Sequence, residues 1–282
     1  MTELIWEQIE GDYAERNLRL RKLLSSDRGH AIFLGDYLRS REDEREVLIR
    51  LFLEDGDNPE QRLNRLLEAT FFEHPHIVRS FEAGLLSRGE FTFSYAVTEQ
   101  GEAPAVQSLS EEEALAFTSQ IISSLRYLHS KNLVYCMLSP QTVVKVGTDW
   151  KLGDFSELRV RGNDEGYGTL SLAARVDTTP PEAVEGIISS AWDIWSLGKT
   201  LRSLVKEGSK HTGELQANRR DADTNGGHPS PDPFRSVILA CLNVNPSSRP
   251  SLDQLSALLH SAETGTPRDE RLSLWKARGS GL

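Results

Sequence analysis

The sequence predicts an α+β fold, in which strands dominate the N-terminal part and helices the C-terminal part. Residues 24–35 contain two short stretches around a polar turn, a pattern typical of a hairpin. In residues 111–130, apolar side chains recur at helical spacing, after Ser110 as a possible cap and with three acids in the first turn. This change of pattern along the chain favours a β-rich segment followed by a helical one.

Two further elements support this fold class. Residues 143–146 and 149–152 predict a second hairpin, with Gly147 in its turn. A helix after residue 191 is indicated by one apolar stripe. The members of the stripe are Ile194, Leu197, Leu201 and Leu204.

Composition excludes several classes of function. The 282 residues carry a net charge of −10 at pH 7, which disfavours nucleic-acid binding through a basic surface. No apolar run is long enough to span a membrane, and the N-terminus lacks the basic start and apolar stretch of a signal peptide. Cys136 and Cys241 are the only cysteines and fit neither a zinc site nor a disulfide framework. We therefore expect a cytoplasmic protein with no membrane span and no nucleic-acid partner.

Three segments differ in character from these elements. Residues 1–17 are expected to form an N-terminal extension with a short amphipathic helix. Its apolar side chains are Ile5, Trp6, Ile9 and Tyr13. Residues 206–233 are strongly polar and predict a flexible loop with one short helix near 212–219. Residues 263–282 predict a polar tail.

One stretch carries the most information about function. Residues 133–156 read Leu-Val-Tyr-Cys-Met-Leu-Ser-Pro-Gln-Thr-Val-Val-Lys-Val-Gly-Thr-Asp-Trp-Lys-Leu-Gly-Asp-Phe-Ser. This stretch resembles the catalytic loop and metal-binding strand of the protein kinase family, which read His-Arg-Asp-Leu-Lys-Pro-x-Asn and Asp-Phe-Gly. Residues 180–182, 191–198 and 245–250 resemble later motifs of the same family, in the same order.

The resemblance covers residues 18–262. The overall pattern of this part of the chain is similar to that of bacterial Ser/Thr kinase domains. It implies the two-lobed protein-kinase fold. A small β-rich N-lobe is expected over residues 18–100 and a mostly helical C-lobe over residues 101–262.

The resemblance also implies that most catalytic groups are replaced. Met137 stands at the place of the catalytic base, Ser139 at that of the loop Lys, and Thr142 at that of the Asn that holds a second metal ion. A thioether lacks the charge and the basicity for this proton transfer, and a hydroxyl is a poorer ligand for a hard cation. Asp154 remains as a metal ligand of the family. The alternative for Asp154 is an acid that caps a turn at a strand end.

The nucleotide-binding part departs in a similar way. Ser25, Asp27 and His30 stand where the family has glycines over the ATP phosphates, and the Asp27 charge would repel phosphate, so an ordinary polar turn is favoured. Arg50 replaces the phosphate-binding Lys. Leu48 replaces a small residue that packs on adenine, and would intrude on that pocket or fill it.

The partner of the phosphate-binding Lys is also replaced. Arg65 stands where an acid would pair with that Lys, so we expect repulsion between Arg50 and Arg65. Glu68 and Lys22 are the candidates to substitute for the lost acid and the lost Lys. Arg50 and Asp154 are therefore weak candidates for binding ATP and Mg, and no cofactor is expected.

Three residues are implied to stabilise the C-lobe rather than to react. Arg249 would form a buried ion pair with Glu182, an interaction whose disruption costs about 3–5 kcal/mol. Asp193 would brace the backbone.

These departures predict a catalytically inactive kinase-like protein, a pseudokinase, which is not an enzyme. It would act as a scaffold or allosteric regulator that binds a protein partner, such as an active kinase or its substrate. The alternative is a weak or unconventional ATP-dependent Ser/Thr protein kinase, or a nucleotide-binding switch. That alternative rests on Asp154, Arg50 and the intact C-lobe motifs.

Overall fold

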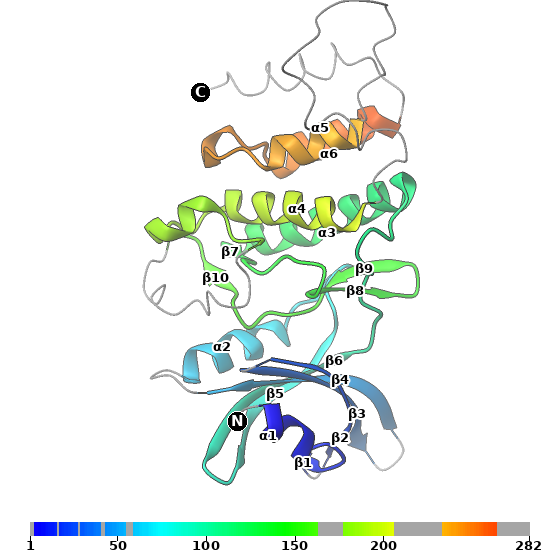
Figure 1. Ribbon diagram of the computed structural model, residues 1–282, viewed down its shortest axis with the longest axis vertical. Coiled ribbons are helices and arrows are strands. Elements are labelled where there is room, and N and C mark those ends of the chain that lie inside the picture. The colour runs from blue at the N-terminus through cyan, green and yellow to red at the C-terminus, as the bar shows by residue number, and fades with distance from the viewer. Residues whose placement is uncertain are drawn as a thin grey trace, which may run out of the picture. The chain divides into compact units, whose positions relative to one another are not determined.

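The structure is a computed structural model that describes residues 3–15, 17–27, 29–40, 43–54, 59–162, 177–205 and 233–263. The chain forms two compact units (Figure 1). The first comprises residues 1–102 and 144–158, and the second residues 103–143 and 159–282. The flexible loop, short helix and polar tail predicted after residue 205 lie outside the described residues, except that Pro233 begins one helix and Glu263 ends another.

The first unit is built on an antiparallel sheet of six strands among the described residues, in the order β1-β2-β3-β4-β6-β5. These strands are β1 (Tyr13–Glu15), β2 (Leu18–Ser26), β3 (His30–Ser40), β4 (Asp43–Leu53), β5 (Ser80–Arg88) and β6 (Phe91–Glu99). Helices α1 (Glu3–Gln8) and α2 (Pro59–Ala69) belong to the same unit. The α+β fold class predicted from the sequence is therefore confirmed.

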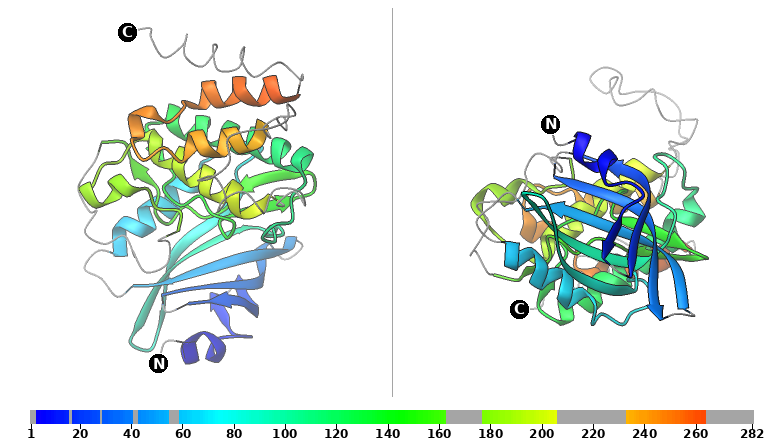
Figure 2. Two further views of the ribbon diagram at one scale, coloured as in Figure 1. Left: turned by 45° about the horizontal axis from the view of Figure 1, so that its top comes forward. Right: turned by 90° about the horizontal axis from the view of Figure 1, so that it is seen from below.

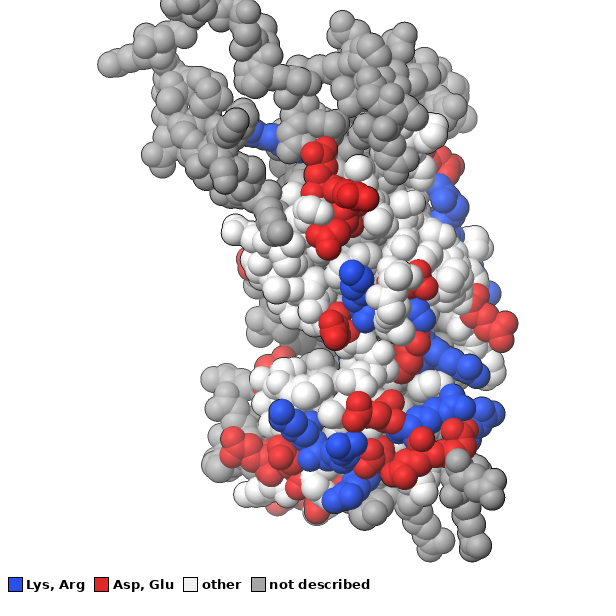
Figure 3. Space-filling model, turned by 90° about the vertical axis from the view of Figure 1, so that its right-hand side faces the viewer, with Lys and Arg blue, Asp and Glu red and all other residues white. Residues whose placement is uncertain are grey.

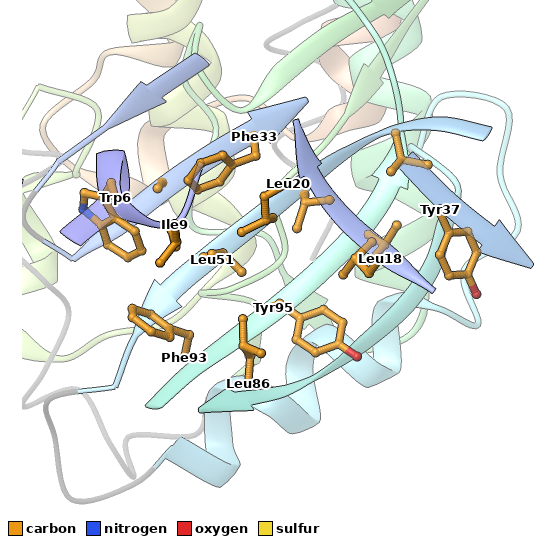
Figure 4. Packing of buried hydrophobic residues seen from close by; sticks show 14 residues of the cluster. Trp6, Ile9, Leu18, Leu20, Phe33, Tyr37, Leu51, Leu86, Phe93 and Tyr95 are labelled. Carbon is orange, nitrogen blue, oxygen red and sulfur yellow. The ribbon is translucent and has the colours of Figure 1, made fainter. Parts of the chain in front are cut away.

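The two faces of the sheet have different neighbours, because successive side chains of a strand point to opposite faces. In β4, one face contributes Val47, Ile49 and Leu51, and the other contributes Leu48, Arg50 and Phe52. The first set joins a buried cluster with Trp6 and Ile9 of the N-terminal segment (Figure 4). On the opposite face, Phe52 packs with Leu66 of α2.

The N-terminal helix is shorter than the sequence predicted. It was expected to continue through Tyr13, but α1 ends at Gln8 and Tyr13 begins β1. Gly11 has a φ of 88°, a left-handed conformation that glycine adopts readily and that interrupts a helix. Its N–H donates to the carbonyl of Leu20, so the chain turns onto β2.

The predicted second hairpin is present as β8 (Val143–Val146) and β9 (Asp149–Leu152). Gly147 in its turn has a φ of 62°. Residues 144–158 cluster with the first unit, although the sequence had placed them in the second lobe. The N–H of Leu152 donates to His76 O at 3.0 Å, and the N–H of Val78 donates to Leu152 O at 2.9 Å.

The second unit is mostly helical. Its described helices are α3 (Glu111–Ser130), α4 (Ser190–Leu204), α5 (Pro233–Cys241) and α6 (Leu252–Glu263), with short 3-10 turns η3 (Pro181–Glu185) and η4 (Pro246–Ser248). Strands β7 (Leu133–Val134) and β10 (Arg159–Val160) pair within it. Helix α3 packs against α4 and α6, and α5 packs against the same two helices (Figure 2). Ser110 caps α3, as the sequence indicated, and the structure adds a reciprocal bond from the N–H of Ser110 to the Glu113 carboxylate.

In the lower part of the face that Figure 3 shows, charged side chains of both signs are interleaved. On β2, Arg21 pairs with Asp36 at 3.0 Å and with Glu46 at 3.1 Å. Exposed pairs of this kind contribute little to stability. Among the described residues, no helix is both long and apolar enough to cross a membrane.

Candidate functional site

Arg50 is a buried cation on the α2-facing side of the sheet. It is 2% exposed, and its Nη1 donates to Thr98 Oγ1 at 3.0 Å. Leu48, opposite Thr98 in the strand register, has its side chain on the same face and is 5% exposed. Within the described part of the chain, Arg50 makes no ion pair within 4.0 Å. A buried charge without a carboxylate is costly, so this position favours an anion.

Arg65 does not act as the sequence suggested. We expected it to repel Arg50, but its Nη1 donates to Ser156 O at 3.2 Å and lies 3.7 Å from Glu157 Oε2. Its charge is therefore compensated by the segment that follows Asp154. Glu157 gave no signal in the sequence because the two residues are 92 positions apart.

Glu68 and Lys22, the candidates to substitute for the lost acid and Lys, are both exposed, on α2 and β2. Of Arg50 and Lys22, only Arg50 is buried.

Asp154 follows β9 and is 3% exposed. Its Oδ1 accepts a hydrogen bond from the N–H of Ser156 at 3.0 Å, so the carboxylate does cap a turn. Next to it, the ring of Phe155 packs edge-on against Phe72, with centroids 5.4 Å apart. This contact does not test the metal-binding role of Asp154, which stays a prediction.

Among the described residues of the turn between β2 and β3, two backbone N–H groups bond within the turn. The N–H of Asp27 donates to His30 O at 2.8 Å, and the N–H of Gly29 donates to Asp27 Oδ1 at 2.9 Å. This agrees with the polar turn favoured by the sequence. Two N–H groups that could face phosphate are thus engaged within the turn.

In the second unit, the loop that resembles the catalytic loop is rigidly braced. Met137 is fully buried, so its side chain fills the core. Thr142 Oγ1 donates to Met137 O at 2.7 Å and accepts from the N–H of Ser139 at 3.0 Å. Thr142 therefore pins the loop in place. From the sequence, Thr142 was expected only to be a poor metal ligand.

Asp193 of α4 holds the start of the same loop. It accepts from the N–H of Tyr135 at 2.9 Å and from the N–H of Cys136 at 2.8 Å, while His129 Nε2 lies 2.7 Å from its Oδ2. Cys136 has a φ of 62°, which is unusual for a residue with a Cβ. Both backbone bonds to Asp193 stabilise this conformation. The part played by His129 was not expected from the sequence.

Glu182 and Arg249 form a buried, bidentate ion pair. Arg249 Nη1 and Nη2 donate to the two carboxylate oxygens at 2.5 and 2.7 Å, and Nη1 also donates to Ala191 O at 2.9 Å. The guanidinium lies over the ring of Trp195, 4.9 Å from its centroid. The pair ties η3 to the start of α4 and to the end of η4.

Neither cysteine has the surroundings of a nucleophile. Cys136 packs in an apolar cluster with Val134, Ile188 and Trp192. Burial raises the pKa of the Cys241 thiol to about 12, so it stays protonated near neutral pH.

Within the described ranges, no three or more His, Cys, Asp or Glu side chains gather as a metal site. A metal here would need Asp154 together with oxygens from a bound ligand. Mg²⁺ commonly binds in this way, through one or two carboxylates and substrate phosphates.

The comparison with known proteins settles the family. The model of the protein kinase domain matches residues 41–260, and the chain belongs to that family. It is similar to Aurora kinase of Dictyostelium discoideum (28% identical over 170 residues, 57% of this chain and 43% of the relative). It is also similar to Serine/threonine-protein kinase PknG of Mycobacterium leprae (30% over 180 residues, 58% and 22%). A third relative is Ephrin type-A receptor 1 of Homo sapiens (26% over 267 residues, 86% and 27%). The chain thus spans less than half the length of these relatives.

The prediction that the chain is not an enzyme is wrong by this comparison, because its relatives are named as kinases of both the Ser/Thr and the Tyr type. The prediction of inactivity gave too much weight to the loss of single side chains. In phosphoryl transfer the protein contributes mainly positioning and electrostatic stabilisation. General acid–base catalysis typically contributes about 10²–10⁴-fold to a rate, so the replacement of one base is not evidence that a kinase is inactive.

Proposed function

We propose that this domain binds ATP with a divalent cation and transfers phosphate slowly to protein Ser or Thr side chains. It would be an unconventional member of its family. The observation that carries the proposal is the buried Arg50 guanidinium, which has one hydrogen bond to Thr98 and no described carboxylate partner. A phosphate group would supply the missing negative charge through charge-assisted hydrogen bonds.

The residues of the first unit fit such a ligand in part. Arg50 would hold phosphate oxygens, and Asp154 would hold the cation, which when bound neutralises charge on the phosphates. Leu48 narrows the space for the base on the same face, so phosphate contacts are expected to contribute more to affinity than adenine contacts. A protein partner of the kind expected from the sequence would then be a substrate or a regulator of the domain.

The rate is expected to be low because no carboxylate replaces the base at Met137. The substrate hydroxyl would lose its proton to solvent or to the transferred phosphoryl group. What the chain contributes is positioning: Thr142 and Asp193 fix the loop, and Arg50 binds phosphate.

Binding of nucleotide without transfer is the second candidate. It is favoured by one observation: Met137, which stands at the place of the base, is fully buried, so its side chain is closed to a substrate hydroxyl. Such a domain would use ATP as a switch.

The test is a thermal-shift titration with ATP and ADP, with and without Mg²⁺ or Mn²⁺. Nucleotide at 100 times its Kd is expected to stabilise the folded state by about 2.7 kcal/mol. Arg50→Met should abolish this shift while raising the melting temperature of the ligand-free protein, since replacing a buried, uncompensated charge by an apolar group is often stabilising. Arg50→Lys should retain binding.

Transfer is measured with γ-labelled ATP and a mixture of Ser- and Thr-containing peptides. Activity that disappears in Asp154→Ala would support the transferase, and binding without labelled product would support the switch. No thermal shift up to millimolar nucleotide, with either metal, would overturn both.

A further inference from the structure

The N-terminal segment, residues 3–15, lies along the outer edge of β2; we call it the N-terminal strap. The N–H of Gly11 donates to Leu20 O at 2.6 Å, and the N–H of Leu20 donates to Asp12 O at 2.9 Å. Further along β2, the N–H of Leu23 donates to the Glu10 carboxylate at 3.0 Å. The strap therefore occupies backbone groups that an edge strand would otherwise expose.

The strap also reaches the turn between β2 and β3. Trp6 Nε1 donates to Asp27 O at 2.8 Å. The Trp6 ring is fully buried and packs against Phe93, with centroids 5.3 Å apart (Figure 4). A tryptophan fixed in this way holds the Asp27 carbonyl at a defined position, because the buried ring has little freedom to follow a moving turn.

Asp27 is thereby held through its carbonyl, its N–H and its side chain. The N–H donates to His30 O, and Oδ1 accepts from the N–H of Gly29. In this conformation the N–H groups of Asp27 and Gly29 both bond within the turn and not to a ligand, and Asp27 adds a carboxylate. Both properties oppose phosphate binding, because free N–H groups bind phosphate and a nearby carboxylate repels it.

We propose that Trp6 is a positioning residue through which the N-terminal strap keeps the β2–β3 turn closed to phosphate, so that the strap restrains nucleotide binding. This inference rests on the proposed function, because it concerns regulation of the same nucleotide site. Releasing the strap would let the turn open and give its N–H groups to the phosphates.

The test uses the full chain with Trp6→Phe, which keeps an aromatic ring and removes the donor. Phe93→Leu is the matched control, because it loosens the same cluster and leaves the Trp6 donor in place. The readout is the ratio of ATP affinity to adenosine affinity, measured by calorimetry. A general loss of packing changes both affinities, whereas a change at the turn affects only the ligand with phosphates.

Trp6→Phe is expected to raise this ratio about two- to tenfold, the change that corresponds to one net hydrogen bond. Phe93→Leu should leave it unchanged. Amide hydrogen exchange without nucleotide should show faster exchange at Asp27 and Gly29 in Trp6→Phe only. If Trp6→Phe does not fold, benzothienylalanine at position 6 removes the N–H at nearly constant ring size.

An unchanged or lower ratio in a folded Trp6 variant would overturn the inference, as would an equal rise in Phe93→Leu. If the wild-type chain binds adenosine and ATP but the ratio does not move, only the inference fails. If the wild-type chain binds neither adenosine nor ATP, the proposed function is wrong, and so is the inferred restraint on nucleotide binding. The exchange data then show separately whether Trp6 holds the turn.

Discussion

At the scale of single residues, His74 makes the stability of the first unit depend on pH. The N–H of His76 donates to His74 Nδ1 at 3.1 Å, which requires this nitrogen to be unprotonated. Burial lowers the pKa of His74 from its ordinary value of 6.5, and the neighbouring His76 ring lowers it further. Geometry and the pKa direction therefore agree that the folded state prefers neutral His74.

We predict that this histidine weakens the fold in mild acid. Since its pKa is lower in the folded than in the unfolded state, the unfolded state binds more protons, and stability is lost as pH falls from about 6.5 through the folded-state pKa. In urea unfolding at pH 7.5 and 5.5, His74→Gln should lose less stability than the wild type. Glu60→Gln, which changes an exposed acid of α2, is the control and should behave as the wild type. An equal loss in all three would place the pH dependence elsewhere.

The roles of some residues of the site were predicted from the sequence, and those of others were not. Glu182, Arg249 and Asp193 were recognised because each stands inside a motif of fixed spacing, and their contacts are those the motifs imply. Thr142 and His129 were missed as braces, because a hydroxyl and an imidazole have many possible partners. Only the fold brings Thr142 to the Met137 carbonyl and His129 to Asp193.

At the scale of elements, α2 is tied both to the segment after β9 and to β4. Arg65 bonds Ser156 O and approaches Glu157, while Arg62 on the same helix pairs with Glu54 at 2.8 Å. The first contact lies beside Asp154, and the second lies at the end of β4. Position of the helix is thereby coupled to the candidate metal ligand.

A double-mutant cycle on Arg65→Ala and Glu157→Ala should give a coupling of about 1 kcal/mol in unfolding free energy, as expected for a partly buried pair. Because the contact adjoins Asp154, each single variant should also weaken binding of ATP with Mg²⁺ severalfold, and binding without metal much less. Arg62→Ala is the control: it should cost stability without changing the metal dependence. A coupling near zero, or an equal effect of Arg62→Ala on metal dependence, would contradict this assignment.

At the scale of the whole molecule, the two units are not consecutive halves of the chain. Residues 144–158, which contain the hairpin of β8 and β9, interrupt the second unit in sequence and belong to the first. Besides its hydrogen bonds to residues 76–78, it contributes an ion pair between Lys151 and Glu99 at 2.7 Å and a backbone pairing between Lys145 and Glu102. The first unit therefore includes residues that follow the segment 103–143 of the second unit in sequence.

We predict that residues 1–102 alone fold less stably than the same residues joined to 144–158. The pairing of Glu102 with Lys145 brings the two ends close, so a linker of a few residues suffices. The linked fragment should show a cooperative urea transition at a clearly higher midpoint. Replacing 144–158 by a Gly/Ser segment of equal length is the control. Equal midpoints for all three fragments would show that the hairpin is not part of the folding unit.

The sequence by itself determined the fold class, the family motifs and the helices and hairpins with strong local patterns. These depend on spacing along the chain, which periodic burial and turn chemistry encode directly. The tertiary structure decided three other matters: Arg65 pairs with Glu157, Trp6 holds the Asp27 carbonyl, and Arg50 remains without a described carboxylate. Each depends on which side chains from distant segments meet in a buried space, and local spacing carries no record of that.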